Sequence, residues 1–181
     1  VIAVNIIDFG TNHNFKLDSV HQIIADSLKQ QIDLAAIDLL QEKMKQASDI
    51  LFIADNCGEV VFDRLLIEPY RSKMTLAVRG RPIMNDVTRR EAKMSGLEGL
   101  VKIIDTGDAI PGVVLSDSGE EFKSHFSSAD LIISKGQGNF ETLHETDRPT
   151  FFLFKAKCPV IAEMLGSELG SLHVIARNIS P

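Results

Sequence analysis

The stretch ILFIADNCGE, Ile50–Glu59, decides the prediction of the fold. Its first four residues are all apolar, as is typical of a strand that is buried on both faces. Two acids, an amide and a glycine follow where that strand ends, and a helical pattern begins directly after them. These polar residues either form a turn and cap the following helix, or they bind an electrophilic group such as a metal ion.

The same alternation of apolar run, polar turn and helical pattern recurs along the chain. Strands are predicted at 1–7, 50–54, 74–79, 101–105, 130–134, 150–155 and 172–176. Helices are predicted at 17–31, 33–48, 58–71, 86–96, 118–128, 139–145 and 158–166, with 17–48 as a helical segment near the start. This order predicts an α/β fold of three layers: a mostly parallel, Rossmann-like sheet with helices on both faces, in a single domain over 1–181.

Three local signals predict where helices begin. Asp33 has the place of an N-cap, and Ser118 with Glu121 has the spacing of a capping box. Pro159 stands where the first turn of a helix tolerates proline.

Composition excludes several classes of protein. The chain has 181 residues and a formal net charge of −6, which argues against a nucleic-acid surface. No apolar run reaches the roughly 18 residues of a membrane span, and the opening VIAVNII lacks the basic start of a signal peptide. Cys57 and Cys158 have neither disulfide-framework nor zinc-site spacing, so a cytoplasmic location is predicted. Because the chain begins at Val1 with core-like residues, we expect further sequence upstream.

Polar residues gather where the predicted strands end, which is where open α/β sheets bind ligands. Acids and amides follow the early strands: Asp8, Asp55-Asn56 and Asn85-Asp86. Lysines and glycines follow the late strands: Lys135-Gly136-Gln137-Gly138-Asn139, then Lys155 and Lys157. Carboxylate and amide oxygens suit Mg²⁺ or Mn²⁺, whereas glycine N–H groups and lysines suit an anion. A metal beside a phosphate cradle is a common arrangement for phosphoryl transfer.

Each of these signals also has a purely structural interpretation. Asp55-Asn56 and Asn85-Asp86 are both good helix caps. Glycine pairs such as Gly136 and Gly138 occur in many ordinary turns, and lysines at the end of a strand are commonly solvated. Cys57 is better explained as a packing residue than as a nucleophile, because no base stands beside it in the sequence.

Four motifs in order resemble the damage-control phosphatase family: DNCGEVVFDRLL, RPIMNDVT, SKGQGNFETL and FKAKCPVIAE. This family comprises metal-dependent phosphatases and includes relatives described as acidic-residue methyltransferases. The opening VNIIDFG is similar as well, so the resemblance runs from residue 4 to residue 165. It implies an upstream helical domain outside this chain. Val4 stands where the family often has glycine, which leaves a role for Asn5 open.

The resemblance also implies roles for particular residues. Asp55, Asn56 and Asp86 match the catalytic metal ligands, for one divalent ion: Mg²⁺, Mn²⁺, Co²⁺ or Ni²⁺. The matches to substrate-binding positions are Glu59, Lys135, Gly136, Gln137, Gly138, Asn139 and Lys155.

The first functional hypothesis is therefore a metal-dependent phosphatase for a small phosphorylated metabolite, such as a sugar phosphate. The second is a module that binds a nucleotide or sugar phosphate without cleaving it. The third is a carboxyl methyltransferase that uses S-adenosylmethionine. A haloacid-dehalogenase signature would need aspartate at Cys57, and no P-loop motif occurs. Neither a nucleic-acid nor a membrane partner is expected, and the sequence does not determine the oligomeric state.

Overall fold

The computed structural model describes residue 25 and residues 29–180. The predicted strand at 1–7, Asp8 and most of the predicted helix at 17–31 lie outside the described residues. Within them, the structure has a six-stranded sheet. Its strands are β1 (Ile50–Ile53), β2 (Met74–Val78), β3 (Lys102–Asp105), β4 (Leu131–Lys135), β5 (Thr150–Lys155) and β6 (Leu172–Arg177).

The strands lie in the order β3-β2-β1-β4-β5-β6. All neighbours pair in parallel except β5 and β6, which are antiparallel. The chain builds outward from β1 through β2 to β3, then returns to place β4 on the other side of β1. The crevice between the ends of β1 and β4 is therefore the topological switch point, where ligands bind in folds of this kind.

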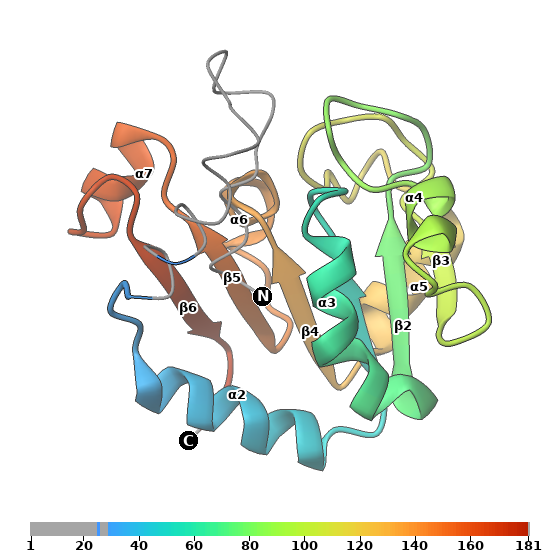
Figure 1. Ribbon diagram of the computed structural model, residues 1–181, viewed down its shortest axis with the longest axis horizontal. Helices are drawn as coiled ribbons and strands as arrows, with labels where there is room; N and C mark the ends of the chain where they lie inside the picture. The colour runs from blue at the N-terminus through green and yellow to red at the C-terminus, as the bar shows by residue number, and fades with distance from the viewer. Residues whose placement is uncertain (1–24, 26–28, 181) are drawn as a thin grey trace.

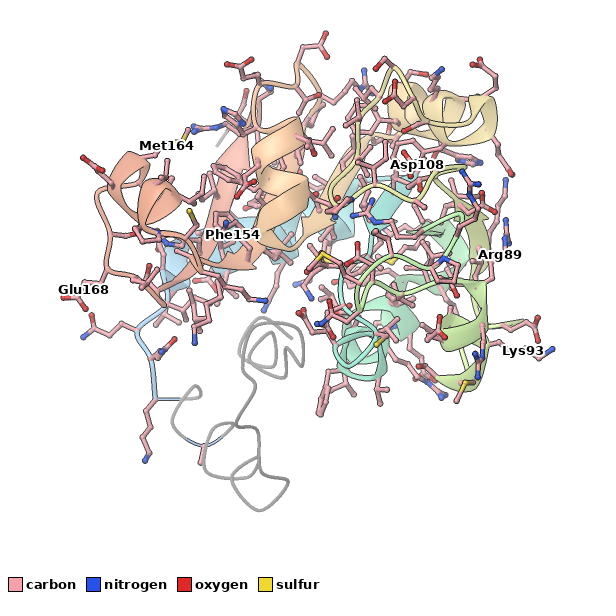
Figure 2. All side chains as sticks on the ribbon, turned by 90° about the horizontal axis from the view of Figure 1, so that it is seen from above. Arg89, Lys93, Asp108, Phe154, Met164 and Glu168 are labelled. Atoms are coloured by element: carbon pink, nitrogen blue, oxygen red, sulfur yellow. The ribbon has the colours of Figure 1, made fainter. Side chains whose placement is uncertain are left out.

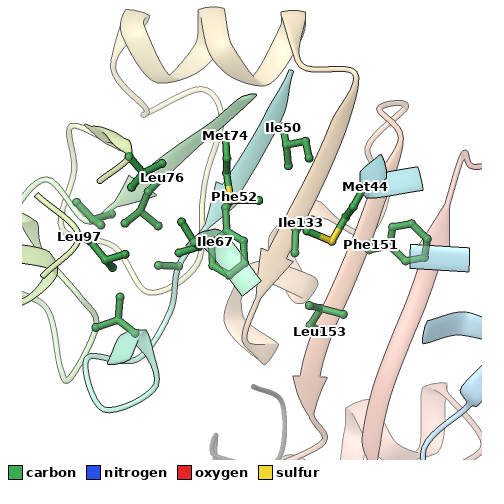
Figure 3. Packing of buried hydrophobic residues seen from close by; sticks show 14 of the residues in the cluster. Met44, Ile50, Phe52, Ile67, Met74, Leu76, Leu97, Ile133, Phe151 and Leu153 are labelled. Carbon is green, nitrogen blue, oxygen red and sulfur yellow. The ribbon is translucent and has the colours of Figure 1, made fainter. Parts of the chain in front are cut away.

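Helices cover both faces of the sheet, which confirms the predicted three layers (Figure 1). One core cluster joins the sheet to α2 (Leu34–Gln46), α3 (Val60–Ile67) and α4 (Arg89–Met94), and Figure 3 shows its packing. The other cluster joins the opposite face to α5 (Glu120–Ser128), α6 (Gln137–Leu143) and α7 (Pro159–Met164). A 3₁₀ helix, η3 (Glu68–Lys73), follows α3. Among the described residues, no helix has the length and apolar character needed to cross a membrane.

The helix starts are only partly as predicted. Asp33 is the N-cap of α2, and its Oδ1 accepts the backbone N–H of Ala36 at 3.1 Å. The capping box predicted at Ser118 is wrong, because Gly119 is the N-cap of α5 and the Ser118 hydroxyl donates to the Val114 carbonyl instead. The structure has a capping box at Thr88, whose hydroxyl and backbone N–H pair with the third residue of α4.

Candidate active site

The loop after β2 folds back onto the end of β1. The backbone N–H of Val87 donates to the Asp55 carbonyl at 2.8 Å, and Asn56 and Asp86 form an isolated antiparallel bridge. Neither acid–amide pair supplies the N-cap residue of a helix, because Glu59 is the N-cap of α3 and Thr88 is the N-cap of α4. In the turn before α3, Oδ1 of Asn56 accepts the backbone N–H of Gly58 at 2.7 Å. The structure thus brings Asp55, Asn56 and Asp86 together at one strand end.

These three residues line a cavity of about 270 Å³ at the carboxyl edge of the parallel strands. Figure 2 views that edge from above, and its labels mark Phe154 in β5 and Asp108 beyond β3. The opposite part of the lining comes from the second half of the sheet. It includes Gln137 and Gly138 at the start of α6, and Lys157 after β5. The remaining lining residues are Met84, Asn85, Pro111, Gly112 and Glu141.

Gly136 packs its backbone directly against the Asp55 carboxylate. A Cβ on Gly136 would stand 2.1 Å from Cγ of Asp55 and 2.2 Å from Oδ2, closer than any real contact. Gly136 also has φ of +85°, a conformation that side chains with a Cβ rarely adopt. Both the space and the backbone therefore require glycine here, and the close approach fixes the position of the Asp55 carboxylate.

Replacing Gly136 with alanine is expected to destabilise the protein more than the same change at Gly99. Gly99 has φ of +79° but nothing within 4 Å of its Cβ position, so Gly99→Ala measures the backbone strain alone. That strain costs about 1–2 kcal/mol, and the clash with Asp55 adds about 1–3 kcal/mol more. Urea unfolding of the two variants provides the measurement. Equal losses would show that the Asp55 carboxylate is free to move aside.

The charges around Asp55 suit a cation. Burial, and after it the nearby Asp86 carboxylate, raises the pKa of Asp55 to about 6, although the positive charges of Lys135, Lys157 and Arg79 act in the opposite direction. No group of three or more His, Cys, Asp and Glu side chains in residues 29–180 is arranged to hold a metal ion. The set here is instead two carboxylates and one amide. Such a set fits Mg²⁺ or Mn²⁺, which commonly take one or two carboxylates and complete their shell with water and phosphate.

Arg79, which follows β2 directly, connects this acid pair to the loop after β4. Its Nε donates to Oδ2 of Asp86 at 2.7 Å, and its Nη2 donates to Oδ1 of Asn139 at 2.8 Å. The Asn139 amide in turn donates to the carbonyls of Lys135 at 2.7 Å and Ala54 at 3.3 Å. One buried side chain, Asn139, thereby fastens the ends of β1, β2 and β4 together. Asn139 was predicted to contact substrate, whereas the printed sequence gave no hint of this role for Arg79.

Glu59 and Lys135 lie in a buried cluster with Asp63 of α3, and none of the three side chains is more than 1% exposed. The Lys135 ammonium donates to Oε2 of Glu59 and, at 2.9 Å, to Oδ1 of Asp63. Burial alone would lower the pKa of Lys135, but the two carboxylates raise it overall. Burial raises the pKa of Glu59 to about 8 despite Lys135. In this structure these predicted substrate residues face one another rather than the cavity, and sequence reasoning missed Asp63.

Stability is expected to fall as pH rises from about 4.5 to about 8. The ordinary pKa of a glutamate, 4.5, applies to Glu59 in the unfolded chain, and its pKa in the folded protein is about 8. Folding therefore takes up a proton at any pH between these two values. Because the folded state binds more protons, raising the pH favours the unfolded chain, by a few kcal/mol across this window. Unfolding free energies at pH 5 and pH 8 test this.

The Glu59→Gln variant should lose the part of that pH dependence that lies above about pH 6, because Asp55, whose pKa is also raised but only to about 6, contributes to the fall at lower pH. Glu68→Gln is the matched control, since Glu68 pairs with Arg64 on the exposed surface at the end of the same helix. An unchanged slope in Glu59→Gln would contradict the assignment of the proton to this cluster.

The remaining predicted substrate residues divide into two groups. Gln137 and Gly138 line the cavity, with Gly136 just behind them against Asp55. Lys155 does not line it. Its Cε lies 3.5 Å from where a Cβ on Gly170 would stand, and the lysine in the cavity wall is Lys157. Strand β5 ends at Lys155, and the chain reaches the cavity only two residues later.

Comparison with known proteins places this chain among relatives. Residues 1–172 match the model of the damage-control phosphatase ARMT1-like domain. The chain is 42% identical over 182 residues to the damage-control phosphatase PH1575 of Pyrococcus horikoshii, and 39% identical over 185 residues to an uncharacterized protein, MJ0202, of Methanocaldococcus jannaschii. These matches cover 98% and 97% of this chain, but 62% and 60% of the relatives.

A solved structure agrees with the sequence matches. The crystal structure of the DUF89 family protein from Pyrococcus horikoshii matches this fold with a TM-score of 0.83 and 41% sequence identity. The match covers 97% of this chain and 62% of that one. By sequence and by fold, the chain belongs to the damage-control phosphatase ARMT1-like domain family.

Proposed function

We propose that the protein is a metal-dependent phosphatase that hydrolyses a small phosphomonoester, such as a sugar phosphate, in the cavity at the switch point. One observation carries the proposal. The acid–amide set Asp55, Asn56 and Asp86 shares a cavity of about 270 Å³ with Lys157 and the glycine-containing start of α6. The name of the Pyrococcus horikoshii relative agrees with this activity, but the chain spans only about three fifths of that relative's length.

Asp55, Asn56 and Asp86 would hold the one divalent cation. Their hard oxygen ligands favour Mg²⁺ or Mn²⁺, and Co²⁺ or Ni²⁺ are further candidates. Once bound, such an ion supplies Lewis acidity to the phosphoryl group and organises its oxygens for displacement. Arg79 keeps Asp86 oriented through its 2.7 Å bond to Oδ2.

The rest of the chemistry falls to groups of this chain. Lys157 offsets negative charge on the phosphoryl oxygens, and the backbone at Gly138 allows the substrate to approach closely. The attacking group is water or, as the alternative, the Asp55 carboxylate itself. With a pKa of about 6, Asp55 is ionised at neutral pH and suits either role.

Direct contact with the substrate stays a prediction for Glu59, Lys135, Asn139 and Lys155. The first three form hydrogen bonds with one another, with Asp63, with Arg79 and with backbone carbonyls. We propose that Glu59, Lys135 and Asn139 support the cavity from beneath. Both cysteines are free thiols, in keeping with the cytoplasmic location that we propose.

The test is phosphate release from a panel of sugar phosphates and other phosphomonoesters, with Mg²⁺, Mn²⁺, Co²⁺, Ni²⁺ or a chelator. We expect release with metal, and a fall to the uncatalysed rate once the chelator removes it. Saturable binding of the same compounds without any release over hours would instead favour a binding module. Methyl transfer from S-adenosylmethionine to acidic side chains would favour the third hypothesis.

A further inference from the structure

The side chain of Gln137 accepts hydrogen bonds from two successive backbone amides on the far side of the cavity. Its Oε1 takes the N–H of Lys157 at 2.7 Å and the N–H of Cys158 at 3.2 Å. The next residue is Pro159, the first of α7, which has no N–H to donate. One side-chain oxygen therefore satisfies both backbone donors that lie between Ala156 and α7.

The Gln137 amide is held in one orientation from both ends. Its Nε2 donates to Oε1 of Glu141 at 2.6 Å, one helical turn further along α6. A flipped amide would turn its NH₂ group toward two N–H donors and its oxygen toward a carboxylate, so every contact would become repulsive. Glu141 thus sets the orientation of Gln137, and Gln137 presents its oxygen to the chain at Lys157.

This arrangement anchors the backbone from which the cavity's lysine extends. Just before Lys157, the N–H of Ala156 donates to the Ser171 carbonyl at 2.9 Å. Lys157 and Asp55 line the same cavity, and their opposite charges interact. A lysine side chain is long and flexible, so the place of its ammonium group depends on how firmly its backbone is fixed.

We propose that Gln137 is a positioning residue: by fixing the backbone of Lys157, it sets where the lysine meets the phosphate group of the substrate. This inference rests on the proposed function, since it assumes that Lys157 binds that phosphate. It gives Gln137 a role through Lys157, in place of a direct contact with substrate.

The first experiment is a double-mutant cycle with inorganic phosphate as the probe, in the presence of Mn²⁺, followed by calorimetry. We expect Gln137→Ala to weaken phosphate binding roughly fivefold to tenfold, from the loss of two hydrogen bonds. Lys157→Ala should weaken it at least as much. If Gln137 acts through the lysine, Gln137→Ala has no further effect in the Lys157→Ala background. Fully additive losses would overturn the proposal.

The second experiment exchanges the two partners. Gln137→Glu alone places two carboxylates one helical turn apart, which is repulsive, and should weaken phosphate binding. Adding Glu141→Gln restores one donor and one acceptor at the same net charge, so binding should recover. Failure to recover would count against the proposal. Gln46→Ala serves as the control, because Gln46 donates to Glu42 at 2.8 Å in the same way, but on α2.

A third measurement separates this inference from the proposed function. Amide hydrogen exchange by NMR should show slow exchange at Lys157 and Cys158, and faster exchange in Gln137→Ala. If both amides stay equally protected in the variant, the positioning role is refuted while the phosphatase activity stands. If the wild-type protein releases phosphate from no phosphomonoester with any metal, the proposed function fails, whatever the exchange rates show.

Discussion

Asp86→Ala is expected to lower kcat/KM for a phosphomonoester substrate about a thousandfold. The variant removes one of two carboxylates from the proposed metal set and leaves Arg79 without its acceptor at Oδ2. It should therefore bind Mn²⁺ far more weakly as well, which calorimetry without any substrate can measure. A direct binding measurement keeps the result independent of which substrate is used.

Two further variants sharpen that test. Asp86→Asn keeps an oxygen that can accept from Arg79, so it separates loss of charge from loss of folding. Asp105→Ala is the matched control, because Asp105, the last residue of β3, also pairs with an arginine, Arg89, at 2.8 Å, but outside the cavity. If Asp86→Ala had the same activity and the same Mn²⁺ affinity as Asp105→Ala, Asp86 could not belong to the metal set.

The largest loss of stability is expected from Lys135→Met. Methionine has a similar length but no charge, so Glu59 and Asp63 would stay buried without a cation. Breaking a buried ion pair from one side commonly costs about 3–5 kcal/mol. The loss should be smaller at pH 5 than at pH 8, because protonation can neutralise the two acids at low pH. Urea unfolding at both values measures it.

Lys155→Met is the comparison for that experiment. Lys155 ends strand β5 as Lys135 ends β4, yet it is only partly buried and has no ion pair with a carboxylate among those found in the described residues. We expect its loss to change the free energy of unfolding by less than about 1 kcal/mol. Similar losses for the two lysines would mean that the buried cluster contributes little.

The strands could be predicted because the sheet is buried on both faces. A strand such as Ile50–Ile53 is buried at every position, so it stands out as a continuous apolar run. The start of α4 could not be predicted in the same way. The predicted helix at 86–96 begins only at Arg89, because the Val87 N–H donates its hydrogen bond to the Asp55 carbonyl. That contact joins distant parts of the chain, so no local pattern reveals it.

The candidate site was predictable to the extent that topology governs it. Parallel strands end at one edge, so the residues that follow them must gather there. No comparable rule predicts which residues support the cavity from beneath. Glu59 and Lys135 are 76 residues apart, and Arg79 and Asn139 are 60 apart, with no local pattern that links them. Which of Lys155 and Lys157 reaches the cavity likewise depended on where β5 ends.

The buried cluster also bears on how the protein is made. Glu59 and Asp63 belong to α3, which follows β1 in the first half of the fold, whereas Lys135 ends β4, the first strand of the second half. A ribosome therefore releases both acids well before their cation, and burying them without it is unfavourable. We therefore expect α3 to pack stably onto the sheet only after β4 has been made, so that the nascent chain completes its first core late in synthesis.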